Sequence, residues 1–205
     1  MTRVAVLGTG VVGRTLADRL SEVGHDVVVG SRTAKDDGTR TFADAAAHGE
    51  VVVNATAGLV SIDALTLAGA ANLAGKPLLD VSNALDFSVG FPPVVHTSDR
   101  ESLAERIQAA FPEARVVKSL NTMNAAVMAD PRQLAGPHTA LMAGDDDDAK
   151  RTVAGLLGDL GWRDDEILDL GGLAGARGLE LYITLWLSVR VALGTNAFNI
   201  HVVRE

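Results

Sequence analysis

Short apolar runs alternate along the chain with longer segments in which apolar residues recur every three or four positions. The short runs predict buried strands, and the recurring spacing predicts amphipathic helices. Strands are predicted at residues 4–7, 27–29, 51–53, 77–81, 115–120, 138–143 and 167–170. Helices are predicted at 12–23, 41–48, 61–70, 99–110, 146–160 and 174–193, with a long loop at 82–98. The alternation predicts an α/β fold with a doubly wound, mostly parallel sheet and helices on both faces.

The turn after the first predicted strand has the spacing G-x-G-x-x-G of a dinucleotide-binding site. In this motif Gly8 permits the tight turn, Gly10 lets the backbone approach a pyrophosphate, and Gly13 allows close packing of helix and strand. The N-terminus of the following helix attracts the phosphates. A strand before the motif, a helix after it and a second strand about 20 residues later make the motif more specific. These features predict a Rossmann domain over residues 1–170, followed by a C-terminal helical segment over residues 171–205. The predicted cofactor contacts in the turn are Gly8, Thr9, Gly10, Val11, Val12 and Gly13.

The end of the second predicted strand indicates which dinucleotide is bound. NAD sites commonly place an acidic residue there for the ribose 2′-hydroxyl, whereas NADP sites have an arginine nearby for the 2′-phosphate. Gly30 occupies the position of the acid, and Ser31 and Arg32 follow it. A hydroxyl and a planar guanidinium suit phosphate oxygens, and Lys35 adds a positive charge. The pattern favours NADP(H), with NAD(H) as the alternative.

Small residues, several of them polar, follow the next predicted strands. In a doubly wound sheet the ligand lies beyond the carboxyl ends of the strands. The residues after the third, fourth and fifth strands are therefore candidates for contacts with the cofactor's ribose and nicotinamide. They are Ala55, Thr56, Ala57, Asn83, Asn121, Met123 and Ala125.

Composition limits the partners that the chain is expected to have. A net charge of −8 over 205 residues argues against binding to nucleic acid or to an anionic membrane surface. The absence of cysteine excludes disulfides and thiolate metal sites and is typical of a cytoplasmic protein. No signal peptide is expected before the first strand, and the apolar stretch 179–193 is too short and too interrupted to span a membrane. The acidic run at 145–148 is better explained by a helix N-terminus than by a metal site.

No side-chain arrangement typical of acid–base or nucleophilic catalysis is found, and we predict no catalytic residue. Lys118 and Asn121 resemble the Lys/Asn pairs of some hydroxyacid dehydrogenases, but Lys118 falls inside a predicted strand. This absence favours direct hydride transfer between two redox cofactors, for which the protein supplies orientation and exclusion of water. Two alternatives stay open. One is an NADPH-dependent reductase of a small imine or carbonyl, with Tyr182, His138 or Lys118 as proton donor. The other is a non-catalytic NADP sensor.

Six segments make nearly the whole chain resemble the NADPH-dependent reductases of the deazaflavin coenzyme F420 and their bacterial relatives. They are residues 8–13, 29–32, 116–122, 143–147, 168–171 and 176–180. The resemblance implies hydride transfer between nicotinamide C4 and deazaflavin C5. It also implies NADP contacts from residues 9–12, Ser31, Arg32 and Ala125, with residues 121–123 and the region of Asn199 bordering the second cofactor. Departures from the archaeal members, such as Asn121, lie around the second cofactor, and FAD or FMN therefore stay alternatives to F420.

The C-terminal segment 174–193 is apolar nearly all round. A surface helix normally has a polar face, so this helix is expected to be buried within one subunit or between two. We favour a contact across a two-fold axis, and therefore a homodimer. The family resemblance also implies dimers. Asn196, Phe198 and Asn199 are expected to close over the edge of the nicotinamide.

Overall fold

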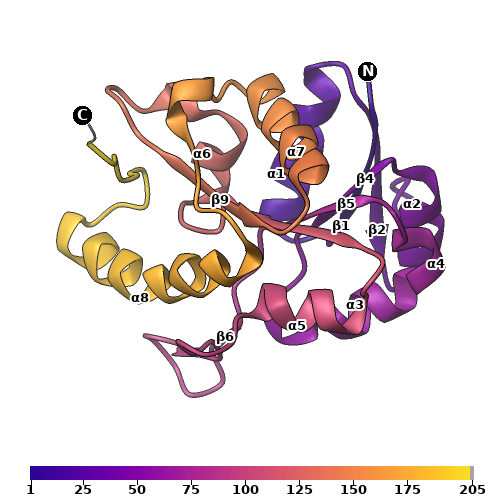
Figure 1. Cartoon of the computed structure of the whole chain (residues 1–205), viewed down its shortest axis with the longest axis horizontal. Coiled ribbons are helices and arrows are strands. Elements are labelled where there is room, and N and C mark those ends of the chain that lie inside the picture. The colour runs from indigo at the N-terminus through magenta and orange to yellow at the C-terminus, as the bar shows by residue number, and fades with distance from the viewer. Residues whose placement is uncertain (204–205) are drawn as a thin grey trace.

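An eight-stranded sheet forms the centre of the molecule, which a computed structural model describes over residues 1–203 (Figure 1). In spatial order its strands are β10 (Ile167–Asp169), β9 (Ala140–Gly144), β8 (Arg115–Ser119), β5 (Pro77–Asp80), β4 (Val51–Asn54), β1 (Arg3–Leu7), β2 (Asp26–Ser31) and β3 (Arg40–Thr41). Within this sheet β8 and β9 pair antiparallel, and the other neighbours pair parallel. The predicted mostly parallel α/β sheet is confirmed.

Helices cover both faces of the sheet. One face carries α1 (Val11–Glu22), α6 (Ala125–Ala129) and α7 (Asp147–Asp159). The other carries α2 (Phe42–His48), α3 (Ser61–Ala68), α4 (Ala70–Leu73), α5 (Leu103–Ala110) and the start of α8 (Ala176–Leu193). Short 3-10 turns lie at Gly58–Val60, Pro131–Gln133, Asp164–Glu166 and Leu173–Gly175. Alternate strand residues enter opposite cores, since Val4 and Val6 belong to the core under α1, and Ala5 and Leu7 to the core under α2. Burial on both faces explains why the strands are continuous apolar runs in the sequence.

The strand order reverses at β1, which lies between β2 and β4. The chain leaves β1 toward one side of the sheet and later returns to its other side. At such a reversal the loops diverge and leave a crevice beyond the carboxyl ends of the strands, where ligands bind. The loops that begin at Gly8 and Ala55 border this crevice, and the backbone N–H of Ala55 donates to Leu7 O at 2.9 Å.

Helix α5 begins at Leu103, four residues later than the predicted helix 99–110, for which Asp99 was the expected N-cap. Ser102 is the cap, because its hydroxyl accepts the N–H of Glu105 while the Glu105 carboxylate accepts the N–H of Ser102. This reciprocal capping box satisfies two helix-end N–H groups. It therefore defines the start of α5 better than a lone aspartate three residues earlier.

Three further predictions are corrected locally. The predicted loop 82–98 contains a two-stranded hairpin, β6 (Leu85–Asp86) and β7 (Val94–Val95). The predicted helix 61–70 is divided at Gly69, whose φ of +89° interrupts the helix. The strand predicted from residue 138 begins at Ala140. Helix α6 and strand β3 are too short to produce a periodic pattern and are absent from the prediction, and Thr41 of β3 falls in the predicted helix 41–48.

Helix α8 carries apolar side chains on all sides, but only some of them are buried. The buried apolar side chains are Leu179, Ile183 and Leu187, whereas Leu185, Val191 and Leu193 are exposed. After α8 the chain turns back, and Ile200 O accepts the N–H of Thr139 at 2.8 Å, just before β9. Within residues 1–203, no helix has both the length and the apolar character needed to cross a membrane.

An ion pair between Arg177 of α8 and Glu105 of α5 predicts a pH-dependent stability. The shortest N–O distance is 2.6 Å, and the hydrogen bonds from Arg177, with those from Ser102, lower the pKa of Glu105 from 4.5 to about 2. A lowered folded-state pKa stabilises the fold above about pH 4.5, and this contribution is lost as the pH falls toward 2. Because Arg177 is partly exposed, solvent weakens the ion pair, and we expect the free energy of unfolding to fall by about 1–2 kcal/mol over this pH range.

Urea unfolding at several pH values between 6 and 3 would measure this contribution. Glu105→Gln should flatten the fall in unfolding free energy over that interval, whereas Glu113→Gln at an exposed position should not. An unchanged pH dependence in Glu105→Gln would contradict the assignment.

Candidate functional site

The glycine turn is built so that only its middle glycine faces open space. Gly8 has a φ of +122°, and a Cβ there would lie 2.5 Å from Ala55 O. A Cβ on Gly13 would lie 2.1 Å from Gly8 O, whereas a Cβ on Gly10 would meet nothing within 4 Å. Gly8 and Gly13 are therefore required by internal packing. Gly10 leaves backbone exposed at the N-terminus of α1, which is where a pyrophosphate would bind, so the turn fits a dinucleotide.

A first cleft of about 560 Å³ extends from this turn across the end of β4. Its lining combines the turn, the loop after β4 and the side chains of α2 and α3. The residues are Gly8, Thr9, Gly10, Arg32, Phe42, Ala55, Thr56, Ala57, Val60, Asp63, Ala64 and Leu67. The cleft thus joins the predicted pyrophosphate site to the residue predicted to select the nucleotide.

Arg32 is exposed at the rim of this first cleft. Asp37, in the loop that follows Arg32, forms an ion pair with Arg14 at 2.8 Å and not with Arg32. Hydrogen bonds from Thr39, and then from Arg14, lower the pKa of Asp37 to about 2. Asp37 is therefore charged and paired at neutral pH. Among residues 1–203 the Arg32 guanidinium has no carboxylate partner, so it fits a ligand phosphate.

A second cavity of about 280 Å³ lies beyond the ends of β5 and β8 and shares residues 55–57 with the first cleft. Its lining is mainly apolar and includes aromatic side chains from the hairpin and from α8. The residues are Val12, Ala55, Thr56, Ala57, Val81, Ser82, Asn83, Leu85, Phe87, Asn121, Met123, Met128, Ile183 and Trp186. The shared residues make the two spaces contiguous, as an extended dinucleotide requires.

Two amide side chains join the loops at this second cavity. Asn83 Nδ2 donates to the backbone O of Asn121 at 2.9 Å, and Asn121 Nδ2 donates to Asn83 Oδ1 at 2.9 Å and to Leu179 O at 3.0 Å. Three buried polar atoms nearby have no partner among the described residues: Asn121 Oδ1, Thr122 Oγ1 and Trp186 Nε1. Unpaired buried polar groups are costly, and two of these residues, Asn121 and Trp186, line the cavity, so a ligand bound there could pair with them.

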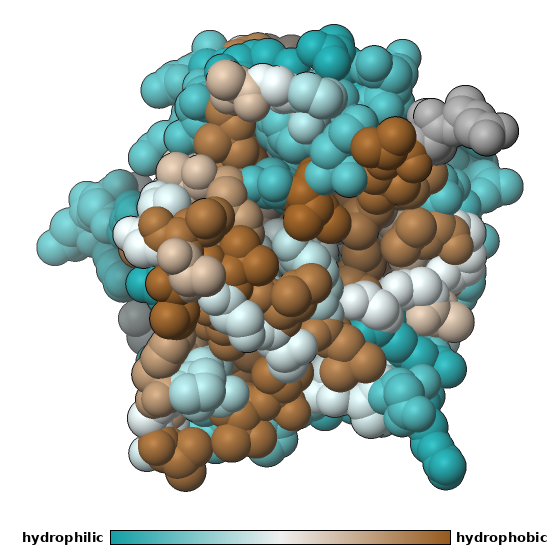
Figure 2. Space-filling model, turned by 90° about the vertical axis from the view of Figure 1, so that its left-hand side faces the viewer, coloured by the Kyte–Doolittle hydropathy of each residue, from teal (hydrophilic) through white to brown (hydrophobic). Residues whose placement is uncertain are grey.

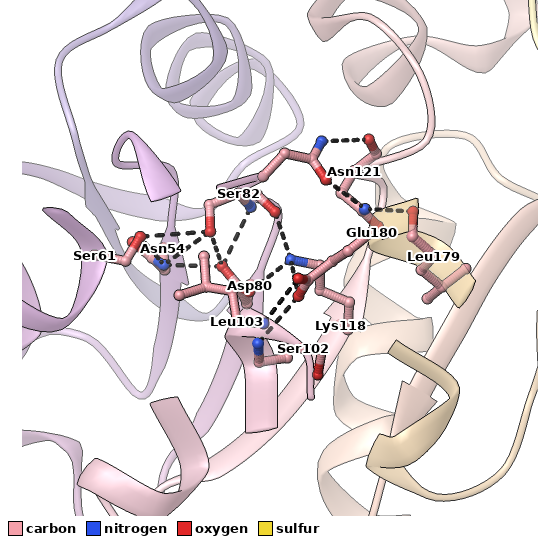
Figure 3. A network of polar contacts seen from close by, with 12 residues as sticks. Asn54, Ser61, Asp80, Ser82, Ser102, Leu103, Lys118, Asn121, Leu179 and Glu180 are labelled. Carbon is pink, nitrogen blue, oxygen red and sulfur yellow. Dashed lines mark hydrogen bonds and ion pairs between the residues drawn. The ribbon is translucent and has the colours of Figure 1, made fainter. Parts of the chain in front are cut away.

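A buried ion cluster lies next to this cavity (Figure 3). We use this name for Asp80, Lys118 and Glu180, whose side chains are at most 1% exposed. Lys118 Nζ lies 2.8 Å from Asp80 Oδ2 and 3.1 Å from Glu180 Oε1. Asp80 Oδ1 also accepts from Asn54 Nδ2 at 2.8 Å, which continues the network toward the loop after β4. The Lys118 amine is thus enclosed by partners and does not line either space.

The structure brings most of the predicted site residues together, in two groups. Gly8, Thr9, Gly10 and Arg32 line the first cleft, Val12, Asn83, Asn121 and Met123 line the second cavity, and Ala55, Thr56 and Ala57 line both. The other predicted residues line neither space. Val11 is exposed on α1, Gly13 packs against Gly8, Ser31 is buried with its hydroxyl donating to Thr33 O, and Lys35 and Ala125 lie outside the lining.

Several lining residues were not predicted from the sequence. Phe42, Asp63 and Leu67 come from α2 and α3, Phe87 from the hairpin, and Ile183 and Trp186 from α8. These residues follow neither the glycine turn nor the end of a predicted strand, so the sequence gives no local signal for them. The helical register of α8 is the one exception, because residues 179, 183 and 186 share a face.

The C-terminal turn approaches the second cavity through Trp186. Phe198 stacks on Trp186 with ring centroids 5.3 Å apart. Asn199 Nδ2 lies 3.0 Å from His138 Nδ1, and His138 Nε2 lies 3.0 Å from Pro131 O. Both nitrogens of this histidine are therefore occupied by protein partners, and the ring is buried against Trp162.

Comparison with known proteins identifies similar sequences and structures. The family described as NADP oxidoreductase, coenzyme F420-dependent, matches residues 3–84. A solved structure from Arthrobacter sp. FB24, described as a candidate F420-dependent NADP-reductase, is 46% identical, with a TM-score of 0.93 and complete coverage of both chains.

Two more distant similarities concern other reductases. The metalloreductase STEAP3 of Rattus norvegicus is 34% identical over 186 residues, which are 87% of this chain and 36% of that protein. The chain therefore spans about a third of the length of this curated relative. An imine reductase from Aspergillus terreus has a TM-score of 0.64 at 20% identity, with coverage of 95% of this chain and 63% of that one. This last similarity concerns the fold alone.

Proposed function

We propose that this chain transfers hydride directly between NADP(H) and a deazaflavin or flavin. The proposal starts from its family, since the chain belongs to the coenzyme F420-dependent NADP oxidoreductases. The chain is an NADP-dependent oxidoreductase, and its hydride partner is the proposed part. The observation that carries the proposal is the contiguity of the two spaces through residues 55–57. One space has phosphate-binding groups, and the other has an apolar lining suited to flat rings.

In the first cleft, the residues of the proposed site bind the nucleotide at two points. The exposed backbone at Gly10 and the N-terminus of α1 hold the pyrophosphate, and Arg32 holds the 2′-phosphate. When bound, the nicotinamide supplies the hydride from C4, with both electrons. The residues of the first cleft only hold the nucleotide, and this fixes where its nicotinamide lies relative to the second cavity.

In the second cavity, the chain's residues orient the rings and exclude water. Asn121 lines this cavity, and its Oδ1 is an acceptor without a partner among the described residues that suits the carboxamide of a nicotinamide. Phe87 and Trp186 offer aromatic surfaces to a flat partner such as F420, FAD or FMN. Because direct hydride transfer needs orientation and a dry cavity rather than an acid or base, the absence of a catalytic dyad is compatible with this reaction.

Anaerobic mixing of the purified protein with NADPH and F420, FAD or FMN would test the proposal. We expect bleaching of F420 or of a flavin. With F420, deuterium from NADPH deuterated at C4 should be retained at C5, because the new C–D bond does not exchange with water. With a flavin the N–D bond at N5 exchanges with water, so the expected sign of direct transfer is slower bleaching with deuterated NADPH. The balanced step transfers one hydride from NADPH to the acceptor and takes one proton from solvent. Loss of the deuterium to water when F420 is the acceptor, or no turnover with any of these acceptors, would contradict it.

The imine or carbonyl reductase alternative needs a proton donor near the second cavity. Of the three candidates, Lys118 is enclosed in the ion cluster and both nitrogens of His138 are occupied. Tyr182 retains a hydroxyl without a partner among the described residues, and burial raises its pKa. Turnover of a small imine that is lost in Tyr182→Phe would favour this alternative.

Tight NADPH binding without turnover of any acceptor would favour an NADP sensor. A metal chelate such as ferric citrate is included as a further acceptor in the same assay, because the relative STEAP3 is named a metalloreductase.

We also propose that the segment from residue 171 onward supplies a homodimer contact and one side of the second cavity; residues 204–205 of this segment lie outside the described residues. Figure 2 shows apolar side chains gathered on the face that carries α8. They include Leu185, Val191 and Leu193 of α8 and Phe87, Val89 and Phe91 of the hairpin, each at least 56% exposed. Large exposed apolar patches mark association surfaces, and pairing of identical patches gives a closed two-fold dimer.

Light scattering coupled to size exclusion would measure this association. Leu185→Glu combined with Val191→Glu should convert the dimer into a monomer, because two charges would be buried at the contact. Ala47→Glu, at an exposed position on α2, is the matched control and should leave the mass unchanged. A wild-type protein of monomeric mass would contradict the proposal.

A further inference from the structure

The second cavity is bounded on two opposite sides, which we call the loop side and the helix side. The loop side consists of Ser82, Asn83 and Asn121 at the ends of β5 and β8. The helix side consists of Ile183 and Trp186 on α8. Two flat rings that exchange hydride must fit between such sides, so their separation matters for the reaction.

The ion cluster is bonded directly to the loop side (Figure 3). Lys118 Nζ donates to the backbone oxygen of Ser82 as well as to Asp80. Asp80 Oδ1 accepts from the backbone N–H of Ser82 at 3.2 Å and from its hydroxyl at 2.7 Å. The N–H, the carbonyl and the hydroxyl of Ser82 are therefore all bonded to the cluster. This fixes the backbone just before Asn83, which is the next residue of the loop side.

The same cluster is bonded to the helix side through Glu180. This carboxylate pairs with Lys118 and accepts the N–H groups of Leu103 and Ala104 at 2.8 and 3.0 Å, together with the Thr97 hydroxyl at 2.6 Å. Glu180 precedes Ile183 by three residues, so both lie on one face of α8. The position of α8 relative to the sheet is therefore fixed where this helix meets the cavity.

The charges of the cluster indicate a geometric role. The side chains of Asp80 and Glu180 both contact Lys118 Nζ, and their other partners are hydrogen-bond donors. Buried ion pairs contribute little net stability compared with well-packed apolar side chains, but they specify one arrangement of their neighbours. Here the specified neighbours are the two sides of the cavity.

We infer that the ion cluster sets the separation between the loop side and the helix side, and with it the distance across which hydride moves. Lys118 and Glu180 are positioning residues for the reaction. The assignment of rings to the second cavity rests on the proposed function. Arg32, at the 2′-phosphate end of the first cleft, has no hydrogen bond or ion pair with the cluster in the part of the chain that the structure describes.

Glu180→Gln tests this inference in the full-length protein, with Arg177→Met as the matched control. Arg177 also joins α8 to α5, through Glu105, but has no contact with Ser82 or Lys118. Emission of bound NADPH reports on the nicotinamide end, and calorimetry with 2′,5′-ADP reports on the phosphate end. Neither measurement needs an acceptor.

We expect Glu180→Gln to change the emission of bound NADPH clearly while the affinity for 2′,5′-ADP stays within about twofold. With a working acceptor, kcat should fall at least about tenfold and KM for NADPH should change much less, because a displacement of about 1 Å can cost two orders of magnitude in rate. Arg177→Met should lower the unfolding temperature and leave the emission and kcat unchanged. If Glu180→Gln does not fold, Thr97→Val removes a single hydrogen bond to Glu180 and should produce a smaller change of the same kind.

Three results would overturn the inference. They are unchanged emission in Glu180→Gln, a parallel loss of 2′,5′-ADP affinity, and an equal change in Arg177→Met. A wild-type protein that binds NADPH but reduces neither deazaflavin nor flavin contradicts the proposed function instead, because the emission comparison is made without an acceptor.

Discussion

Replacing Arg32 with alanine is expected to weaken NADPH binding by about 10- to 100-fold and to leave NADH binding within about threefold of wild type. Arg32 lines the first cleft and has no carboxylate partner among the described residues. A hydrogen-bonded charge pair between this guanidinium and the 2′-phosphate is worth about 1.5–3 kcal/mol, and NADH lacks that phosphate. Calorimetric titration with both nucleotides measures the difference.

Lys35 provides the comparison for Arg32 within the same loop. Its side chain is exposed and does not line the cleft, so Lys35→Ala should weaken NADPH binding by no more than about threefold, as is usual for an exposed and solvated charge. An equal loss of NADPH and NADH in Arg32→Ala would show that Arg32 stabilises the loop and does not select the nucleotide.

The second large effect is expected from alanine at Gly13 and Gly10, with opposite consequences for folding. A Cβ at Gly13 would lie 2.1 Å from the backbone oxygen of Gly8, so the turn or the helix must move. We expect Gly13→Ala to lower the free energy of unfolding by about 2–4 kcal/mol, as overpacking against rigid backbone does. NADPH binding should be lost with it, because the turn itself is displaced.

Gly10→Ala should fold normally, since its Cβ would meet no atom within 4 Å and its φ of −74° suits any residue. The same Cβ would enter the space where the pyrophosphate approaches the backbone, and NADPH affinity should fall at least about tenfold, with a similar loss for NADH. Thermal unfolding and calorimetry on both variants separate the two effects. A Gly10→Ala protein that binds NADPH as tightly as wild type would place the pyrophosphate elsewhere.

The parts of the site that depend on local chain geometry could be predicted from the sequence. The glycine turn, Arg32 and the residues after β4, β5 and β8 all follow strand ends, and the topology of a doubly wound sheet brings such residues to one edge. The residues contributed by packing between distant segments could not be predicted. Glu180 becomes a partner of Lys118 only because α8 crosses the end of β8, and a buried glutamate in an apolar helix gives no sign of its partner.

Element boundaries show the same division between local and distant causes. The start of α5 has a local signal, because Ser102 and Glu105 have the spacing of a capping box, and this signal competes with Asp99, a second residue of a type that caps helices. The hairpin inside 82–98 has strands of two residues each. Strands of that length are defined by their pairing with each other and are too short to show a periodicity of two, so the sequence pattern could not reveal them.

Trp186, which stacks on Phe198, gives the protein an intrinsic fluorescence signal at the second cavity. The chain has two tryptophans, of which Trp162 is buried below α6 with its indole N–H bonded to Met128 O, while Trp186 lines the second cavity. Reduced nicotinamide absorbs light in the range where indole emits, so a reduced nucleotide bound beside Trp186 would accept its excitation energy, and the oxidised form would not. Quenching of the native emission would therefore follow the redox state of the bound nucleotide in real time, without any added label.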